Sequence, residues 1–262
     1  MPRTPPVRLL IDSRDFADQD PANLNVAFDT AIKLGSTDWT ASIVRVETFY
    51  SVYNITAAKG NNTFKYSTNS GGAWTTLTLS DGIYSVEDLN TYIQVQMYQN
   101  GDYDSAGTTP AYYITLRVEN GVYSTNKVEF VITNATYQID MSDAGNPTSF
   151  RGLLGFDSGV ITSSAVAQNI ADINDGVDVW YINCDLIRGS YNGGSKSNII
   201  YQFSPAVASN EKVVEQPVNP QPIQVDKSNI RSIKIKLVDS NGDLLSLNGS
   251  HIQYVIQLDR LE

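Results

Sequence analysis

The sequence predicts an all-β sandwich, and two features indicate it. Apolar and polar residues alternate in the segments 233–237 and 252–258 near the end of the chain. A repeat of two residues is the spacing of a strand with one buried face. The composition agrees, because 15 Tyr, 8 Phe and only 18% charged residues suit sheets better than helices.

The last thirty residues are predicted to organise the strand pairing. Asn241-Gly242 is a strong hairpin signal after the first alternating segment, and Asn248-Gly249 marks a second turn before the next one. We expect this C-terminal segment to lie centrally in the sandwich. Its partners should be strands from the N-terminal third of the chain.

The N-terminal third contains three predicted strands, at residues 7–11, 26–34 and 39–53. Residues 1–6 precede them and include three prolines, which lack an amide donor and favour extended backbone. This segment is predicted to be a flexible arm that either stays disordered or becomes ordered on a partner. The third strand should place four side chains on one side, Val44, Val46, Thr48 and Tyr50.

The middle of the chain contains one clear helix, predicted at residues 86–99. Ser85 is suited to the N-cap position, and Asn100-Gly101 supplies a stop signal. One face of this helix is apolar and should lie on a sheet. A hairpin follows at residues 112–132, and residues 134–176 are expected to be mostly loop around an apolar island, Leu153-Leu154-Gly155-Phe156.

The charge and hydropathy of the chain exclude several kinds of partner. The net charge of −10 argues against specific nucleic-acid binding, which needs clustered Lys and Arg. No apolar run approaches 18 residues, so no membrane insertion is expected. Met1–Pro6 is not followed by a signal-peptide core, and we expect synthesis in the cytosol.

Few residues offer chemistry. The single histidine, His251, cannot form a multi-histidine metal site, and the single cysteine, Cys184, lies in a strand pattern typical of a small buried residue. Asp239-Ser240-Asn241-Gly242-Asp243 resembles the start of a calcium loop, but its glycine stands at the fourth position instead of the sixth. A hairpin turn fits better. We expect no catalytic residue, no metal and no cofactor.

Several short motifs follow one another in order between residues 11 and 258. They are Ser13-Arg14-Asp15, Tyr53-Asn54-Ile55, Gly82-Ile83-Tyr84, Leu153-Leu154-Gly155-Phe156 and the turn from Leu237 to Gly242. In this order and spacing, the sequence resembles the penton (vertex) capsid proteins of virophages and polinton-like viruses. It also resembles related minor capsid proteins of large DNA viruses.

This resemblance implies a single jelly roll, which is two four-stranded antiparallel sheets packed face to face. The expected domain spans residues 7–262, with an inserted amphipathic helix and hairpin elaborations around residues 57–176. The resemblance further implies that five copies form a ring at the fivefold vertex of an icosahedral shell. The expected partners are the major capsid protein and other minor capsid proteins, and the expected location is the virion.

Two groups of residues are assigned roles on this basis. The shell contact is expected to involve the arm, because a locally basic segment complements acidic neighbours; the residues are Pro2, Arg3, Thr4, Pro5, Pro6 and Arg8. The motif residues are expected to serve folding. They are Ser13, Arg14, Asp15, Tyr53, Asn54, Ile55, Gly82, Tyr84, Leu154, Gly155, Phe156 and Gly242.

Two other functions stay open from the residues alone. One is a β-sandwich that binds carbohydrate or a receptor, since 15 Tyr and 3 Trp offer candidates for a stacking platform. A monomer or a trimer would favour that function, whereas the vertex function requires a fivefold ring. The other is a hydrolase on a β scaffold, for which the sequence has no recognisable catalytic constellation.

Overall fold

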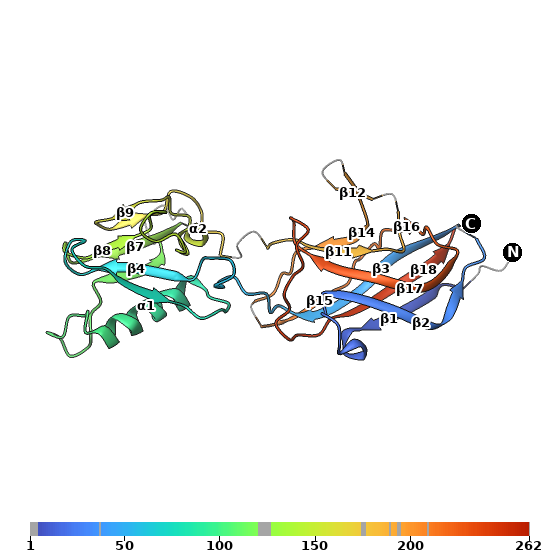
Figure 1. The fold of residues 1–262 in the computed structure, drawn as a ribbon, viewed down its shortest axis with the longest axis horizontal. Coiled ribbons are helices and arrows are strands. Elements are labelled where there is room, and N and C mark those ends of the chain that lie inside the picture. The colour runs from blue at the N-terminus through green and yellow to red at the C-terminus, as the bar shows by residue number, and fades with distance from the viewer. Residues whose placement is uncertain are drawn as a thin grey trace. The chain divides into compact units, whose positions relative to one another are not determined.

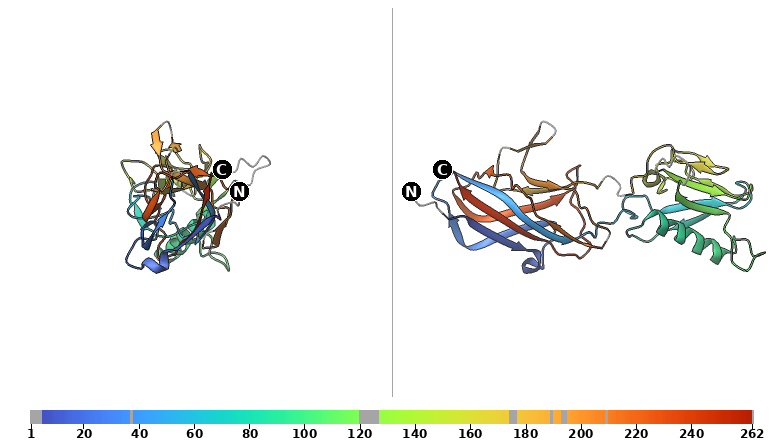
Figure 2. Two further views of the ribbon diagram at one scale, coloured as in Figure 1. Left: turned by 90° about the vertical axis from the view of Figure 1, so that its right-hand side faces the viewer. Right: turned by 180° about the vertical axis from the view of Figure 1, so that it is seen from behind.

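The computed structural model describes residues 5–36, 38–119, 127–173, 177–188, 190–192, 195–208 and 210–261. The chain divides into two compact units. Unit 1 comprises Met1–Val52 and Gly176–Glu262, and unit 2 comprises Tyr53–Asp175. Figure 1 shows both with most of their elements labelled, and Figure 2 gives two further views.

Unit 1 consists of two antiparallel sheets. The first has the order β1-β18-β3-β15, and the short strand β16 also pairs with β3. Its strands are β1 (Val7–Asp12), β18 (Gln253–Arg260), β3 (Trp39–Phe49), β15 (Lys212–Glu215) and β16 (Ile223–Gln224). The second has the order β14-β11-β17-β2, with β14 (Ile199–Phe203), β11 (Trp180–Cys184), β17 (Asn229–Val238) and β2 (Asn23–Lys33).

Two smaller elements complete unit 1. The 3-10 helix η1 (Ser13–Phe16) follows β1 and leads towards β2. The strands β12 (Ser190–Asn192) and β13 (Ser195–Ser197) pair with each other between β11 and β14.

The strand pairings of unit 1 nest in the manner of a jelly roll. β1 pairs with β18, β2 with β17, β3 with β15, and β11 with β14. The first strand therefore meets the last, and each later strand meets one that lies further from the end. A long antiparallel ribbon that rolls over a core in this way forms the two sheets of a jelly roll. The predicted all-β, jelly-roll fold class is confirmed.

The C-terminal strands hold the central positions, as predicted. β17 lies between β11 and β2, and β18 lies between β1 and β3. Ile233 and Ile235 of β17 belong to the same buried cluster as Tyr254 and Ile256 of β18, although the two strands lie in different sheets. Burying a side chain of this size contributes about 1.5–3 kcal/mol, so the alternation in the sequence sets which face of each strand turns inward.

The alternation predicted for β3 was wrong at one position. Val46 and Thr48 are buried as expected, but Val44 is only partly buried and its neighbour Ile43 is 1% exposed. The register against β18 shifts between Val255 and Ile256, which pair with Arg45 and Ile43. A bulge of one residue reverses the inward and outward positions, and no period-two pattern reveals it.

Unit 2 contains two further sheets and the long helix. One sheet has the order β5-β4-β8-β9, with β4 (Thr63–Ser67), β5 (Thr75–Thr78), β8 (Gln138–Asp140) and β9 (Val160–Ile161). The other has the order β10-β7-β6, with β6 (Ile114–Val118), β7 (Val128–Ile132) and β10 (Ala165–Val166). The predicted hairpin is therefore present as β6 and β7, while its Asn120-Gly121 turn lies outside the described residues.

The helix α1 (Val86–Asn100) closely matches its predicted bounds. Ser85 accepts the Asp88 backbone N–H while the Asp88 carboxylate accepts the Ser85 N–H, which forms a capping box. Gly101 ends the helix in the left-handed conformation, at φ 77°. Leu89, Ile93 and Met97 are buried, and the helix packs on β6, along one face of the strands of unit 2 (Figure 2).

The predicted single domain thus divides in two, and the segment predicted as insertions forms most of unit 2. The physical reason is that its apolar residues bury one another. The Phe64 ring stacks on Phe150 at 5.8 Å and packs against Phe130 at 5.9 Å between centroids, in a cluster separate from that of unit 1. Residues 134–176, predicted as mostly loop, contribute three short strands, the helix α2 (Arg151–Leu154) and several members of this core.

Candidate interaction surfaces

Two of the sequence motifs meet each other in unit 2. Ile55 and Gly82 exchange backbone hydrogen bonds of 3.2 and 2.9 Å. The Asn54 side chain donates to the carbonyl oxygens of Tyr84 and Ile173, each at 2.8 Å, and accepts the Tyr84 N–H at 2.9 Å. Asn54 is 6% exposed, so these bonds satisfy backbone groups shielded from water. The amide joins the first and last segments of unit 2.

Gly82 and Tyr84 fit together within this pairing. The Tyr84 ring packs over Gly82, where a Cβ atom would lie 3.0 Å from the ring, and the Tyr84 hydroxyl donates to the Ser80 carbonyl at 2.9 Å. Burial raises the pKa of Tyr84. The folding role expected of Tyr53-Asn54-Ile55 and Gly82-Ile83-Tyr84 stays a prediction, which substitution of Asn54 tests.

The motif Leu154-Gly155-Phe156 lies in the core of unit 2. Leu154 is fully buried, and the Phe156 ring packs against Phe130 at 5.2 Å. Gly155 ends α2 at φ 78°, and a Cβ atom there would lie 2.4 Å from the Asn169 carbonyl oxygen. Only glycine fits this position.

The motif Ser13-Arg14-Asp15 fixes the turn after β1. The Ser13 N–H donates to the Ile252 carbonyl, and the Ser13 hydroxyl accepts the Ile252 N–H, both at 2.9 Å. Hydrogen bonding from the Arg14 guanidinium lowers the pKa of Asp12 to about 2. Asp15 is exposed.

Gly242 adopts φ 88° in the turn that Asp239 closes by accepting two backbone N–H groups.

The arm residues are only partly described. Residues 1–4, which include Pro2, Arg3 and Thr4, lie outside the described residues. Pro5 and Pro6 are exposed. Arg8 belongs to β1 itself, is exposed, and donates to the Gln257 side chain at 3.3 Å.

The two candidate reactive residues lie apart. Cys184 is 1% exposed in the core of unit 1, and burial raises its pKa to about 12. His251 is exposed beside a hollow of about 410 Å³, where Arg14 pairs with Asp12 and Lys212 pairs with Glu47 at 2.5 Å. Among the described residues, no three His, Cys, Asp or Glu side chains gather as metal ligands would.

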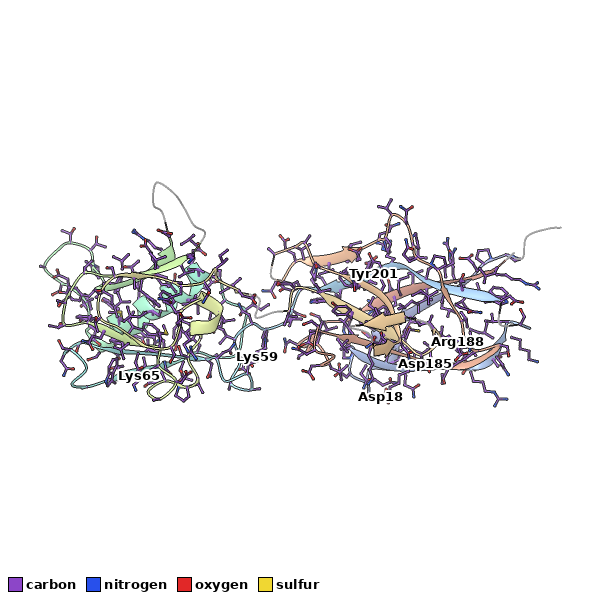
Figure 3. The ribbon with its side chains drawn as sticks, turned by 90° about the horizontal axis from the view of Figure 1, so that it is seen from above. Asp18, Lys59, Lys65, Asp185, Arg188 and Tyr201 are labelled. Carbon is purple, nitrogen blue, oxygen red and sulfur yellow. The ribbon has the colours of Figure 1, made fainter. Side chains whose placement is uncertain are left out.

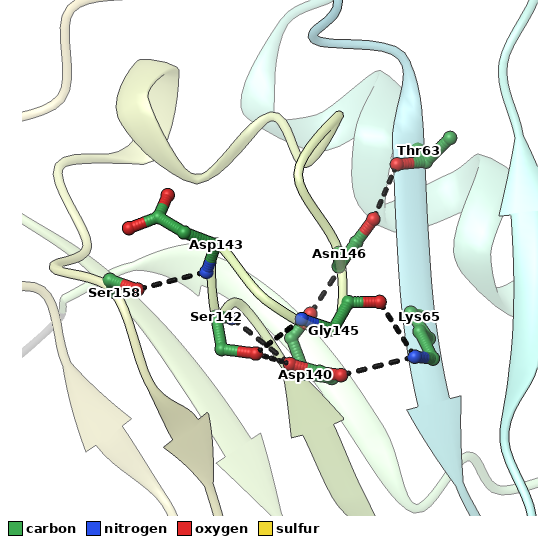
Figure 4. A network of polar contacts seen from close by, with 8 residues as sticks. All are labelled: Thr63, Lys65, Asp140, Ser142, Asp143, Gly145, Asn146 and Ser158. Atoms are coloured by element: carbon green, nitrogen blue, oxygen red, sulfur yellow. Dashed lines mark hydrogen bonds and ion pairs between the residues drawn. The ribbon is translucent and has the colours of Figure 1, made fainter.

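A buried ionic network in unit 2 was missed by the sequence analysis. Asp140 is 4% exposed and contacts the Lys65 ammonium at 3.2 Å, while Lys65 also donates to the Gly145 carbonyl at 2.7 Å (Figure 4). The Ser142 hydroxyl and backbone N–H donate to the same carboxylate, at 2.5 and 3.0 Å. A Cβ atom on Gly145 would lie 2.0 Å from that carboxylate. The network fastens the loop after β8 to β4.

We expect acid to destabilise unit 2 through Asp140. Burial raises the pKa of this carboxyl, but hydrogen bonds from Ser142 and the Lys65 charge outweigh burial and hold it below its ordinary value of 3.8. The carboxylate therefore stabilises the folded state above about pH 4, and this contribution is lost as the pH falls through the lowered pKa. Hydrogen exchange of unit 2 peptides between pH 5 and pH 2.5 measures the loss. An Asp140→Asn variant that loses as much protection as the native protein over this range would contradict the assignment.

A hollow in unit 1 lies on the outer face of the second sheet. It measures about 520 Å³ and is lined by Tyr181 and Asn183 of β11, Lys234 and Lys236 of β17, and the turn 239–242. Asn183 and Lys236 are direct cross-strand neighbours. The floor is therefore rich in hydrogen-bond donors.

The carboxylates at the rim of this hollow are already engaged. Asp185, which Figure 3 labels, accepts the Lys234 backbone N–H at 2.8 Å and pairs with Lys227 at 2.7 Å. Asp239 accepts the N–H groups of Asn241 and Asp243. The ammonium groups of Lys234 and Lys236, by contrast, form no ion pair within the part of the chain that the structure describes. The hollow therefore presents two lysine ammonium groups that have no carboxylate partner among the described residues, beside two carboxylates that other groups hold.

Comparison with known proteins identifies a similar fold. The crystal structure of selenomethionine-labelled mavirus penton protein matches this chain with a TM-score of 0.54 at 8% sequence identity. The match covers 98% of this chain and 99% of that chain. No protein-family model matches the sequence, and no curated protein matches it. No helix in the described ranges is both long and apolar enough to cross a bilayer.

Proposed function

We propose that the chain is a structural protein of an icosahedral viral capsid and that five copies form a ring at each fivefold vertex. The observation that carries this proposal is the fold, a jelly roll with a compact insertion, which is similar to the mavirus penton protein over nearly the whole length of both chains. A jelly roll suits a shell because its two sheets bury each other and leave loops and edges for neighbours. The protein acts by binding neighbours, and catalysis is not part of the proposal.

The proposed partners are further copies of the chain, the major capsid protein and other minor capsid proteins of the same virion. A contact between different surfaces of identical copies closes into a ring when a whole number of equal rotations from copy to copy completes a full turn. Native mass spectrometry of the purified protein, alone and with its major capsid protein, tests this. We expect a pentamer in at least one of the two samples. Monomers or trimers in both would contradict the proposal.

We further propose that the N-terminal arm contacts the shell. Pro5 and Pro6 are exposed directly before β1, and the prolines limit the conformational entropy that the arm loses when it docks. Arg3 and Arg8 make this end locally basic on a chain of net charge −10.

Deletion of residues 1–6 is expected to leave the fold and the ring intact and to reduce incorporation into shells. The reason is that β1 begins at Val7, so its pairing with β18 is retained. Co-assembly with the major capsid protein, followed by quantification of the vertex protein per shell, measures the effect. Replacing Pro2, Pro5 and Pro6 by alanine is the matched control for arm stiffness. Equal incorporation of the truncated and full-length chains would assign the arm no role in the shell.

One observation favours a second candidate function, which is carbohydrate binding by unit 2. Tyr98 is 51% exposed on α1 and stacks on Tyr103, with ring centroids 4.8 Å apart. An exposed ring held in this way is a platform on which a sugar ring stacks. A glycan array signal that is lost in Tyr98→Ala, from a protein that forms no ring, would favour this candidate.

A further inference from the structure

We infer that Lys234 and Lys236, in the hollow on the second sheet of unit 1, receive the acidic β1–β2 loop of a neighbouring copy of this chain. The inference rests on the proposed ring and specifies one of its contacts. Both surfaces belong to unit 1, and in the described part of the chain neither the two lysines nor Asp15 and Asp18 form an ion pair within 4.0 Å.

The receiving surface is the floor of the hollow. Lys234 and Lys236 point outward because Ile233, Ile235 and Leu237, which alternate with them along β17, are buried. Neither ammonium pairs with a carboxylate in the described part of the chain, whereas Asp185 and Asp239 at the rim are held by other partners. Asn183, the cross-strand neighbour of Lys236, also lines the hollow and adds a side-chain amide as a hydrogen-bond donor. The surface therefore fits carboxylates.

The acidic surface is the turn that follows β1. Residues 13–20 contain Asp15, Asp18 and Asp20 against one basic residue, Arg14, which is engaged with Asp12. Asp15 and Asp18 are exposed, and their carboxylates accept no hydrogen bond from the residues that the structure describes. The Asp20 carboxylate accepts the Ala22 N–H at 2.9 Å, which fixes the end of the loop before β2.

The two surfaces lie at opposite sides of the second sheet. The hollow is lined by β14, β11 and β17, whereas the acidic loop precedes β2, the strand at the other edge. In Figure 1, β11 and β14 run along the upper side of unit 1 and η1 lies below β1 and β2. Because the two surfaces lie on opposite sides, the lysines and the acidic loop of one copy cannot contact each other. A contact between the lysines of one copy and the loop of the next is head-to-tail, and contacts of this kind generate rings.

Charge reversal tests this contact because each contact in a ring of identical copies contains both surfaces. We compare Lys234→Glu/Lys236→Glu, Asp15→Lys/Asp18→Lys and the combination of all four substitutions. Lys33→Glu/Arg260→Glu is the matched control, since both side chains are exposed outside the two surfaces and the change in net charge equals that of the first variant. Native mass spectrometry across a protein dilution series at low salt gives the midpoint concentration for ring formation. Circular dichroism verifies the fold, and Lys234→Gln/Lys236→Gln replaces the reversal if the latter does not fold.

We expect each double reversal to raise the midpoint concentration by about tenfold or more, because like charges then face each other. The combined variant should return to within about threefold of the native midpoint, since it restores opposite charges at every contact. The control should leave the midpoint unchanged. Native rings should also weaken with salt, because screening shortens the Debye length to about 3 Å at 1 M.

Two outcomes overturn the inference, and they are distinct. If native rings form and both double reversals assemble equally well, or if the combined variant shows no recovery, the contact is elsewhere and the proposed ring stands. If the native chain forms no ring, alone or with the major capsid protein, the proposed function and this contact both fall.

Discussion

We expect the Gly155→Ala substitution to destabilise unit 2 by about 3 kcal/mol or more. Gly155 has φ 78°, a conformation that costs a residue with a Cβ atom about 1–3 kcal/mol. The added methyl would also lie 2.4 Å from the Asn169 carbonyl oxygen and 3.0 Å from that of Ile170, both of which are backbone atoms. Relieving that overlap would disturb the hydrogen bond from the Asn169 N–H to the Gly155 carbonyl.

Gly152→Ala is the matched control for this substitution. It lies in the same short helix, its Cβ atom would meet nothing within 4 Å, and its φ is not positive. We expect it to be neutral or to stabilise by about 0.5–1 kcal/mol, as alanine does in helices. Hydrogen exchange with mass spectrometry reports on peptides of each unit separately. Equal protection of unit 2 in the two variants would show that Gly155 is not needed for its fold.

The Asn54→Ala substitution is expected to have an effect of similar size. It leaves the Tyr84 carbonyl, the Ile173 carbonyl and the Tyr84 N–H without their partner. An unsatisfied buried polar group costs about 1–3 kcal/mol, so the loss should reach about 3 kcal/mol or more unless water enters. Because Asn54 joins both ends of unit 2, peptides around Tyr84 and Ile173 should lose protection together.

The control for Asn54 is the same change at an exposed site. Asn198→Ala removes a side-chain amide that makes no hydrogen bond among the described residues, and we expect a change within about 0.5 kcal/mol. If Asn54→Ala is equally mild, the pairing of the two motifs is held by its backbone bonds alone.

Local signals in the sequence predicted elements whose causes are local. The helix α1 was predicted from Ser85, its apolar face and Gly101, and each of these acts within a few residues of the element. The β17 and β18 strands were predicted from alternation, since both are half-buried ribbons with one inward face. Their central positions were predicted correctly as well, but as an assumption and not from any pairing signal.

The features that the sequence did not predict depend on residues far apart in the chain. The bulge beside Val44 exists only in the register of β3 against β18. The separate core of unit 2 joins Phe64 to Phe130 and Phe150, which no short window brings together. The Lys65–Asp140 contact spans 75 residues. Proximity of this kind is set by the fold and leaves no local pattern.

Of the two candidate surfaces, one has a local signal in the sequence and the other depends on residues far apart in the chain. The basic arm was identified from sequence because its prolines and arginines lie within eight residues of one another. The hollow was not identified, because Lys234 and Lys236 look like ordinary outward positions of a strand. It becomes visible only when β11 places Asn183 beside them and Asp185 is seen to be engaged by Lys227.

The position of the chain in assembled particles tests the central proposal most directly. We would determine the structure of shells that contain this protein by electron cryomicroscopy with icosahedral averaging. We expect density for five jelly rolls around each fivefold axis, into which the β1-β18-β3-β15 and β14-β11-β17-β2 sheets of unit 1 fit. Density at that axis that fits a different protein, with this chain elsewhere or absent, would contradict it.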